Sequence, residues 1–190
     1  MQDAATIYRL KITLQDVTPQ VWRRVEVPTD LALGRLHRVI QIAFGWRDAH
    51  LHQFEGAAGG KRRGGSYTPR PRLKDTSLLA EVAPHDRSEF WYVYDFGDGW
   101  EHRVVVEQVL STEPDTVYPR CVAGERTCPP EDCGGVPGYE ALLNALRHAE
   151  RPDSAELAEW VGDGFDPESF NLEATNVALS RMSRRSPRSR

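Results

Sequence analysis

The chain has 190 residues, the length of one domain with at most a small appendage. Hydrophobic residues make up 39% of it, enough for a core at this length, and the net charge of −4 argues against a dedicated nucleic-acid binder. No apolar run approaches the ~20 residues of a membrane span, and the N-terminus lacks the basic and apolar regions of a signal peptide. We therefore expect a cytoplasmic protein with no membrane partner.

The first part of the chain predicts two strands followed by a helix. Residues 7–14 and 21–27 alternate between inward and outward positions, as strands with one buried face do, and a turn that contains proline joins them. Apolar residues then recur at helical spacing from Leu33 to Phe44, and Gly45 supplies a stop. His37 lies beside this apolar stripe, and we interpret it as a packing residue.

His50 and His52 open the next predicted strand. Side chains two apart on a strand share a face, so the pair presents two imidazoles side by side, as metal sites do. Both are therefore candidate metal ligands, and a pair of surface histidines is the alternative.

A basic loop follows between residues 59 and 74. It holds six basic residues and no acidic one, and its glycines and prolines keep it irregular. Such a surface can contact phosphates, although a solvated loop is the commoner outcome. The candidate nucleic-acid contacts are Lys61, Arg62, Arg63, Arg70 and Arg72.

The segment from Trp91 to Glu107 predicts a β-hairpin with a polar tip. Asp98-Gly99 suits a two-residue turn, because that turn needs positive φ at both positions. This register places Asp95 opposite His102, where the carboxylate would orient the imidazole as a base or metal ligand. The alternatives are a purely structural hydrogen bond and a three-residue turn that would dissolve the pair. The candidate catalytic residues at the tip are Asp95, Asp98, Glu101 and His102.

A segment rich in proline, glycine and cysteine spans residues 118–140. Its clustering of Glu131-Asp132 with Cys133 favours an ordered loop that forms part of a site. Glu131 and Asp132 join the candidate catalytic residues, because carboxylates that meet the hairpin tip could bind a hard divalent ion. The cysteines could bind zinc together with His102 or His148, and isolated thiols are the alternative. The candidate metal ligands are Cys121, Cys128, Cys133, His50, His52 and His102.

Helical spacing recurs near the C-terminus, in residues 139–150, 154–161 and 172–179. Residues 181–190 are rich in arginine and serine, and we predict that they form a disordered basic tail. The sequence therefore predicts a single domain over residues 1–180.

Five motifs occur in a fixed order: YRLKITLQDVTPQVWRRVEVP, LGRLHRVIQIAFGW, HLHQF, YDFGDGWEH and CPPEDCGGVPGYE. With them the chain resembles the plasmid Ri ORF-three-like family, whose members are also labelled insertion-element passenger proteins of the TnpR type. The resemblance covers about residues 7–179. It implies an α+β domain, found in bacteria, archaea and mobile elements, with no established activity. We expect a mainly antiparallel sheet packed on one long helix, with additional C-terminal helices.

Three functions fit these patterns. The first is a binding or accessory protein, associated with mobile elements and without catalysis, whose partner is a protein or a nucleic acid. The second is a metal-dependent hydrolase of the nuclease or phosphatase class, which would use the hairpin tip and Glu131-Asp132 with zinc or another divalent metal. The third is a nucleic-acid-binding module that uses the basic loop at residues 61–74 and the tail.

Overall fold

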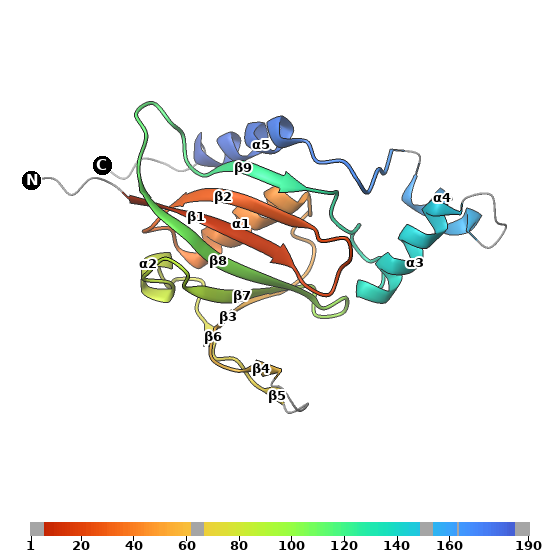
Figure 1. The fold of residues 1–190 in the computed structure, drawn as a ribbon, viewed down its shortest axis with the longest axis horizontal. Helices are drawn as coiled ribbons and strands as arrows, with labels where there is room; N and C mark the ends of the chain where they lie inside the picture. Colours follow the sequence, from red (N-terminus) through yellow and green to blue (C-terminus); the bar gives the residue numbers. More distant parts are fainter. Residues whose placement is uncertain (1–5, 62–66, 149–153, 163, 185–190) are drawn as a thin grey trace, which may run out of the picture.

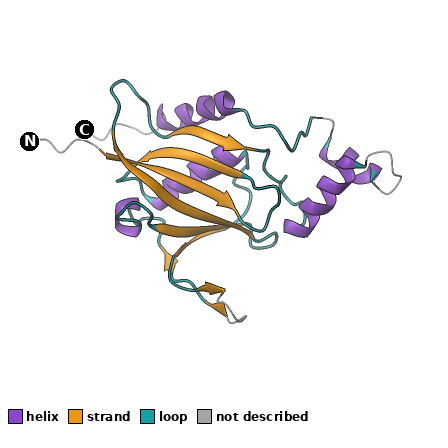
Figure 2. Ribbon diagram, in the orientation of Figure 1, coloured by secondary structure: helices purple, strands orange, loops and turns teal. Residues whose placement is uncertain are grey.

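A seven-stranded sheet forms the centre of the structure (Figures 1 and 2), and every pair of neighbouring strands is antiparallel. The computed structural model describes residues 6–61, 67–148, 154–162 and 164–184. The strand order is β6 (Arg72–Leu73), β3 (His52–Gly56), β7 (Glu89–Tyr94), β8 (Trp100–Ser111), β1 (Thr6–Leu14), β2 (Trp22–Pro28) and β9 (Arg120–Glu125). Two further strands, β4 (Gly60–Lys61) and β5 (Tyr67–Thr68), pair with each other.

The described part of the chain contains five helices in addition to the sheet. They are α1 (Leu33–Phe44), α2 (Leu79–Val82), α3 (Gly135–Arg147), α4 (Ala155–Val161) and α5 (Leu172–Arg184). In Figure 1, α1 lies behind the sheet, α5 runs beside β9, and α3 and α4 lie together beyond one end of the strands. The helix α1 has 12 residues, whereas α3 and α5 have 13 each. The expected α+β class is confirmed, but no single long helix dominates it.

The core lies between the sheet and α1, as the alternation in the sequence predicts. Tyr8, Leu10, Ile12 and Leu14 on β1 are all buried, and so is the apolar stripe of α1. Gly45 ends α1 in a left-handed conformation, with φ at 84°, which a glycine adopts without a steric penalty. The predicted strand pair is also present, since β1 and β2 form an antiparallel pair.

Arg23 on β2 is a cation inside this core, with 2% of its surface exposed. Its guanidinium donates four hydrogen bonds to backbone oxygens, and no carboxylate among the described residues pairs with it. The acceptors are the carbonyls of Trp22 and Glu125 at 2.8 Å, Ala43 at 2.7 Å and Arg126 at 2.8 Å. Burial lowers the pKa of Arg23. This side chain therefore fastens β2 to the end of α1 and to the end of β9.

Ion pairs, rather than a helix, cover the other face of the sheet. Arg24 and Glu107 lie 2.5 Å apart across β1, and Arg9 and Arg120 each approach Glu26 to 2.6 Å. Burial raises the pKa of Glu26, but its hydrogen bonds to the two arginines outweigh burial and hold the pKa below its usual value. The Arg24–Glu107 pair is partly exposed and contributes only about 0–1 kcal/mol. Glu26 is buried, so the loss of either arginine partner would leave a poorly compensated charge inside the protein.

The hairpin of β7 and β8 has a different register from the predicted one. Tyr94 pairs with Trp100 and Tyr92 with His102, so the turn spans the five residues from Asp95 to Gly99. The predicted pairing of Asp95 with His102 is therefore wrong. Tyr92 and Tyr94 are buried, because a register shift of an odd number of residues exchanges the two faces of a strand.

The C-terminal part adds one strand that the sequence did not reveal. β9 pairs with β2 at the edge of the sheet, and α5 covers it. Asn176 of α5 bonds both backbone groups of Cys121 on β9: the amide accepts from the Cys121 N–H at 2.7 Å and donates to its carbonyl at 2.8 Å. The helix α5 extends to Arg184 and so includes the first four residues of the expected tail, and residues 185–190 lie outside the described residues.

No helix in the described ranges is long and apolar enough to cross a membrane.

Candidate functional site

Three connecting segments meet at the end of the sheet nearest α3 (Figure 1). They are the α1–β3 connection at residues 45–51, the β7–β8 turn at residues 95–99, and the β9–α3 connection at residues 126–134. The Asp98 carboxylate accepts a hydrogen bond from the Gly134 N–H at 3.3 Å, and a Cβ on Gly135 would lie 2.6 Å from the Asp98 carbonyl oxygen. Glycine at position 135 therefore permits this close approach between the turn and the start of α3.

His50 lies at the centre of this junction and faces three carboxylates. Its Nε2 is 3.2 Å from Asp132 Oδ1, 3.6 Å from Asp95 Oδ2 and 3.7 Å from Glu131 Oε2. The ligand atoms of His50, Asp95 and Asp132 all lie within 4.8 Å of one another, and no other group of three or more possible ligands occurs in the described part of the chain. His50 Nε2 is buried, yet it has no hydrogen-bond partner among the described residues.

Asp95 has two roles in this cluster. Its Oδ1 accepts hydrogen bonds from the N–H groups of Gly97 at 2.9 Å and Asp98 at 3.3 Å, which shapes the turn. Its backbone is left-handed, with φ at 54°, a conformation that aspartate tolerates better than most residues. The other oxygen, Oδ2, is directed toward His50. The turn therefore holds the carboxylate in place, and the side chain that it faces is His50 rather than the predicted His102.

Glu131 is held in place by two donors. The Tyr94 hydroxyl donates to its carboxylate at 3.0 and 3.2 Å, and the Arg47 N–H donates to Oε1 at 2.9 Å. Burial and the neighbouring carboxylate raise the pKa of Tyr94 to about 12, so its hydroxyl stays protonated and remains a donor at neutral pH. Asp132, by contrast, is 73% exposed in its side chain and lies on the open side of the cluster.

His102 does not belong to the site. It is completely buried, and its Nδ1 lies 3.1 Å from the Trp100 carbonyl oxygen and 3.3 Å from that of Tyr92. Phe44 and Trp46 approach the ring edge-on. Burial lowers the pKa of His102 to about 3, so the imidazole is neutral and has a packing role.

The two histidines of the H-x-H motif serve different sites. His52 is the first residue of β3, and its ring stacks on that of His37 at 3.6 Å between centroids, with an angle of 7° between the planes. Its Nε2 lies 3.3 Å from Asp75 Oδ2, away from the carboxylates that face His50. The prediction that both imidazoles face one metal ion is therefore wrong for this pair.

The cysteines do not converge either. Cys121 and Cys128 are buried, Cys133 is half-buried, and all three are free thiols. Burial raises the pKa of each of them, which disfavours the thiolate that zinc requires. Within the described ranges, none of these cysteines lies in a group of three possible metal ligands. The structure therefore does not support the cysteine zinc site.

The basic loop presents fewer free cations than the sequence suggests. Arg70 pairs with Glu55 at 3.3 Å and with Glu101 at 3.2 Å, and its guanidinium lies 3.7 Å from the centre of the Trp91 ring. This contact also occupies Glu101, a candidate at the hairpin tip. The remaining candidates are Arg72, which is exposed, Lys61, which lies on β4, and Arg62 and Arg63, which fall outside the described residues.

Sequence reasoning missed three side chains that support the site: His37, Gln41 and Tyr94. His37 and Gln41 are one helical turn apart on the buried face of α1, and buried polar residues at that spacing are a signal that could have identified them. The predicted register placed Tyr94 on the hairpin face opposite to Asp95 and His102, so its link to the site was not seen.

The fold and the site together define a class: an α+β protein with an antiparallel sheet, one face covered by a helix, and a histidine–carboxylate cluster at the ends of its strands. The family model described as Plasmid pRiA4b ORF-3-like protein matches residues 6–174, and the chain belongs to this family, as its resemblance implied.

Two relatives span nearly the whole chain. Uncharacterized protein y4hQ of Sinorhizobium fredii (strain NBRC 101917 / NGR234) is 37% identical over 186 residues, which cover 94% of this chain and 93% of that protein. The crystal structure of the protein of unknown function MM3350 from Methanosarcina mazei Go1 has a TM-score of 0.71 and 35% identity, and the match covers 90% of this chain and 97% of that one. The expected association with mobile elements and the cytoplasmic location stay predictions.

Proposed function

We propose that this protein binds one divalent metal ion through His50, Asp95 and Asp132. The observation that carries the proposal is that His50 Nε2 is buried without a hydrogen-bond partner among the described residues, while three carboxylates lie 3.2–3.7 Å from it. A buried polar atom without a partner is costly, and a metal ion would satisfy it together with the carboxylates.

The ligand set favours a borderline transition metal, such as zinc or manganese. One imidazole and two carboxylates suit such ions, whereas calcium and magnesium prefer an all-oxygen set. Three protein ligands leave at least one position for water or another molecule, as in zinc sites that act on substrates. Asp132 supplies the exposed side of the cluster, so this position would be accessible to a partner.

We propose a binding or accessory role for this site, in which the metal ion presents the open position to a partner. A metal-dependent hydrolase is the second candidate, and the same open position favours it. A divalent ion lowers the pKa of a bound water and stabilises negative charge on phosphoryl oxygens. Glu131 lies beside the ligands, where it could accept a proton.

A nucleic-acid-binding role would have to rely on Lys61, Arg72 and Lys74 of this loop and on residues outside the described ranges. Arg70, the central cation of that loop, is already neutralised by Glu55 and Glu101. Steep salt dependence of binding to single- or double-stranded DNA would support this role, and binding that is insensitive to salt would remove it.

Titration calorimetry with zinc, manganese and cobalt tests the proposal, with elemental analysis of the purified protein as a second measurement. We expect about one ion per chain. Substitutions next to metal ligands typically weaken metal binding by about 10- to 100-fold, and His50→Ala and Asp132→Asn, which remove ligands, should weaken it by more. His85→Ala and Asp115→Asn are matched controls, because His85 is exposed and Asp115 is an exposed aspartate with the same left-handed backbone, φ 58°, as Asp132.

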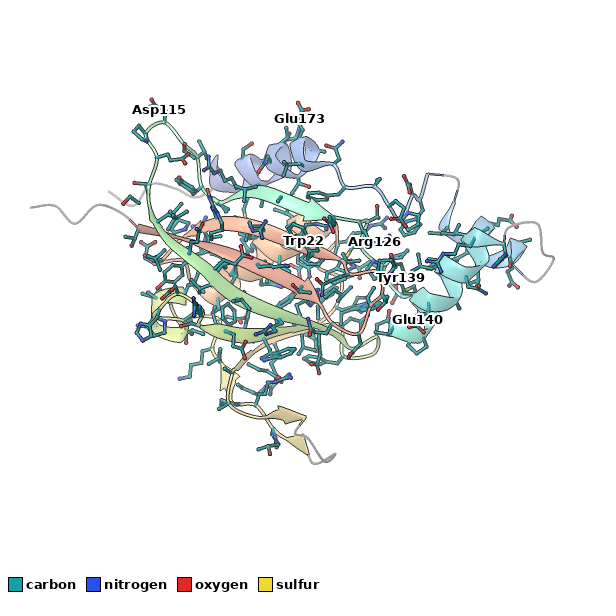
Figure 3. The ribbon with its side chains drawn as sticks, viewed as in Figure 1. Trp22, Asp115, Arg126, Tyr139, Glu140 and Glu173 are labelled. Atoms are coloured by element: carbon teal, nitrogen blue, oxygen red, sulfur yellow. The ribbon has the colours of Figure 1, made fainter. Side chains whose placement is uncertain are left out.

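Both controls should bind like the wild type. Figure 3 shows Asp115 on the β8–β9 loop, far from α3. Equal loss in the controls and the site variants, or no saturable binding by the wild type, would refute the proposal. If the protein binds metal, hydrolysis of bis(p-nitrophenyl) phosphate that requires the ion and His50 would favour the hydrolase, and its absence would favour the binding role.

A further inference from the structure

Side chains hold the middle of the connection that carries His50, while a backbone bond holds its end, where the Asp95 N–H donates to the Leu51 carbonyl at 2.9 Å. Three successive N–H groups, at residues 47–49, each donate to a side chain from a different element. The bonds are Arg47 N to Glu131 Oε1 at 2.9 Å, Asp48 N to Gln41 Oε1 at 2.9 Å, and Ala49 N to the Tyr94 hydroxyl at 3.0 Å. The position of His50, one residue further on, therefore depends on where these side chains lie.

Asp48 has a second anchor in His37. The His37 Nε2 lies 2.8 Å from Asp48 Oδ1, and the His37 Nδ1 lies 2.8 Å from the Tyr92 hydroxyl. Since Gln41 Oε1 accepts from the Asp48 N–H, its amide nitrogen faces Tyr92 and donates to the hydroxyl at 2.9 Å. The Tyr92 proton then goes to His37 Nδ1, which leaves the proton of His37 on Nε2 to bond Asp48. In this arrangement each of the four bonds has one donor and one acceptor.

This network is more elaborate than packing requires. His37 and Gln41 are 4% and 3% exposed on the face of α1 that forms the core, where apolar side chains would avoid the cost of burying polar atoms. Their shared target is Asp48: Gln41 accepts from its N–H and His37 bonds its carboxylate. The network thus acts on the residue two positions before His50.

We propose that His37 is a positioning residue for the metal site, which fixes the connection that presents His50 by holding Asp48. The inference rests on the proposed function. His37 is not itself a ligand of an ion shared with His52, because the lone pairs of two stacked parallel rings lie in separate planes and do not converge on one point.

Two substitutions at position 37 separate positioning from packing. In His37→Gln the amide nitrogen reaches as far as Nε2 and can still donate to Asp48, whereas in His37→Asn the shorter amide can bond only Tyr92. We expect His37→Asn to weaken cobalt binding by about 10- to 100-fold and His37→Gln to retain most of the affinity. Asp48→Gly, in which glycine tolerates the positive φ but has no carboxylate, should lose as much cobalt affinity as His37→Asn. The double variant that combines His37→Asn with Asp48→Gly should lose little more affinity than either single variant.

Val25→Ala, which leaves a cavity on β2, three strands away from the β7 strand that carries Tyr92, is the control for lost stability. It should lower the melting temperature but leave cobalt affinity unchanged. Equal cobalt affinity of His37→Asn and wild type, or equal loss of affinity in His37→Asn and His37→Gln, would overturn the inference.

Amide hydrogen exchange of Asp48 and Ala49 without metal is an independent readout. Faster exchange in His37→Asn than in His37→Gln is expected, and equal rates would overturn the inference. If the wild type binds no cobalt, the proposed function fails, whereas the exchange comparison still tests whether His37 fixes the connection.

Discussion

Replacing His102 with asparagine should change how the stability of the protein depends on pH. His102 is fully buried against Phe44, Trp46 and Tyr92, and its Nδ1 donates to backbone carbonyls. An asparagine amide can take over this donor, but it cannot be protonated. The substitution therefore removes the titration and leaves the hydrogen bond.

The magnitude follows from the pKa, which burial lowers from 6.5 to about 3. Between these values the unfolded chain carries one proton that the folded chain does not, so stability is complete above pH 6.5 and falls as the pH falls. The slope is about 1.4 kcal/mol per pH unit, and the whole interval amounts to on the order of 4–5 kcal/mol. This is a large share of the roughly 5–15 kcal/mol that holds a typical domain together.

Urea unfolding, followed by tryptophan fluorescence between pH 7.5 and 4, measures this difference. At neutral pH we expect His102→Asn to be less stable by roughly 2–3 kcal/mol, because the ring no longer fills its place in the core. The free energies of unfolding of the two proteins should then converge and become equal at about pH 4.5–5. His85→Asn, at an exposed position, is the control. Parallel profiles for wild type and His102→Asn would refute the reasoning.

Three further changes test other features of the fold by the same urea unfolding. Arg23→Lys should cost about 3 kcal/mol or more, since an ammonium cannot reach four carbonyls in the plane of a guanidinium; a loss below 1 kcal/mol would contradict this. Gly138→Ala should unfold the start of α3 or abolish expression of folded protein, because its Cβ would lie 1.8 Å from the Cys133 carbonyl oxygen, whereas a stable variant would show that the loop shifts. Asn176→Ala should cost about 1–3 kcal/mol through the two unsatisfied backbone groups of Cys121. Glu173→Ala, at an exposed position in the first turn of α5 (Figure 3), is the control and should cost at most about 1 kcal/mol through the helix dipole.

Features with a strong local signal could be predicted from the sequence. The buried face of β1 and β2 is indicated by the alternation of apolar residues, and that of α1 by its apolar stripe. Gly45 indicates where the helix ends. β9 could not be found in this way, because RCVAGE lacks a regular alternation and lies between prolines. Its pairing depends on β2, on Asn176 and on the acceptors that it offers to Arg23.

The residues of the proposed metal site were candidates in the sequence, but the sequence did not indicate how they are arranged. His50, Asp95, Glu131 and Asp132 were all candidates, because carboxylates and imidazoles near glycine-rich turns suggest chemistry. The partner of Asp95 was misidentified as His102, since Asp98-Gly99 implies a two-residue turn whereas Asp95 adopts a left-handed conformation and lengthens the turn to five residues. Which histidine meets which carboxylate is decided by three connecting segments that are far apart in the sequence.

The contact between Asn176 and Cys121 also affects how copies of the chain meet. An outer strand with free N–H and C=O groups is a template on which another chain can add a strand, and proteins block it to avoid aggregation. Here the side-chain amide of Asn176 occupies both groups of Cys121 in the way that a neighbouring strand would. Loss of α5 or of this amide would therefore expose an edge strand on which another copy of the chain could add a strand. The yield of soluble protein would then decline before the fold itself was lost.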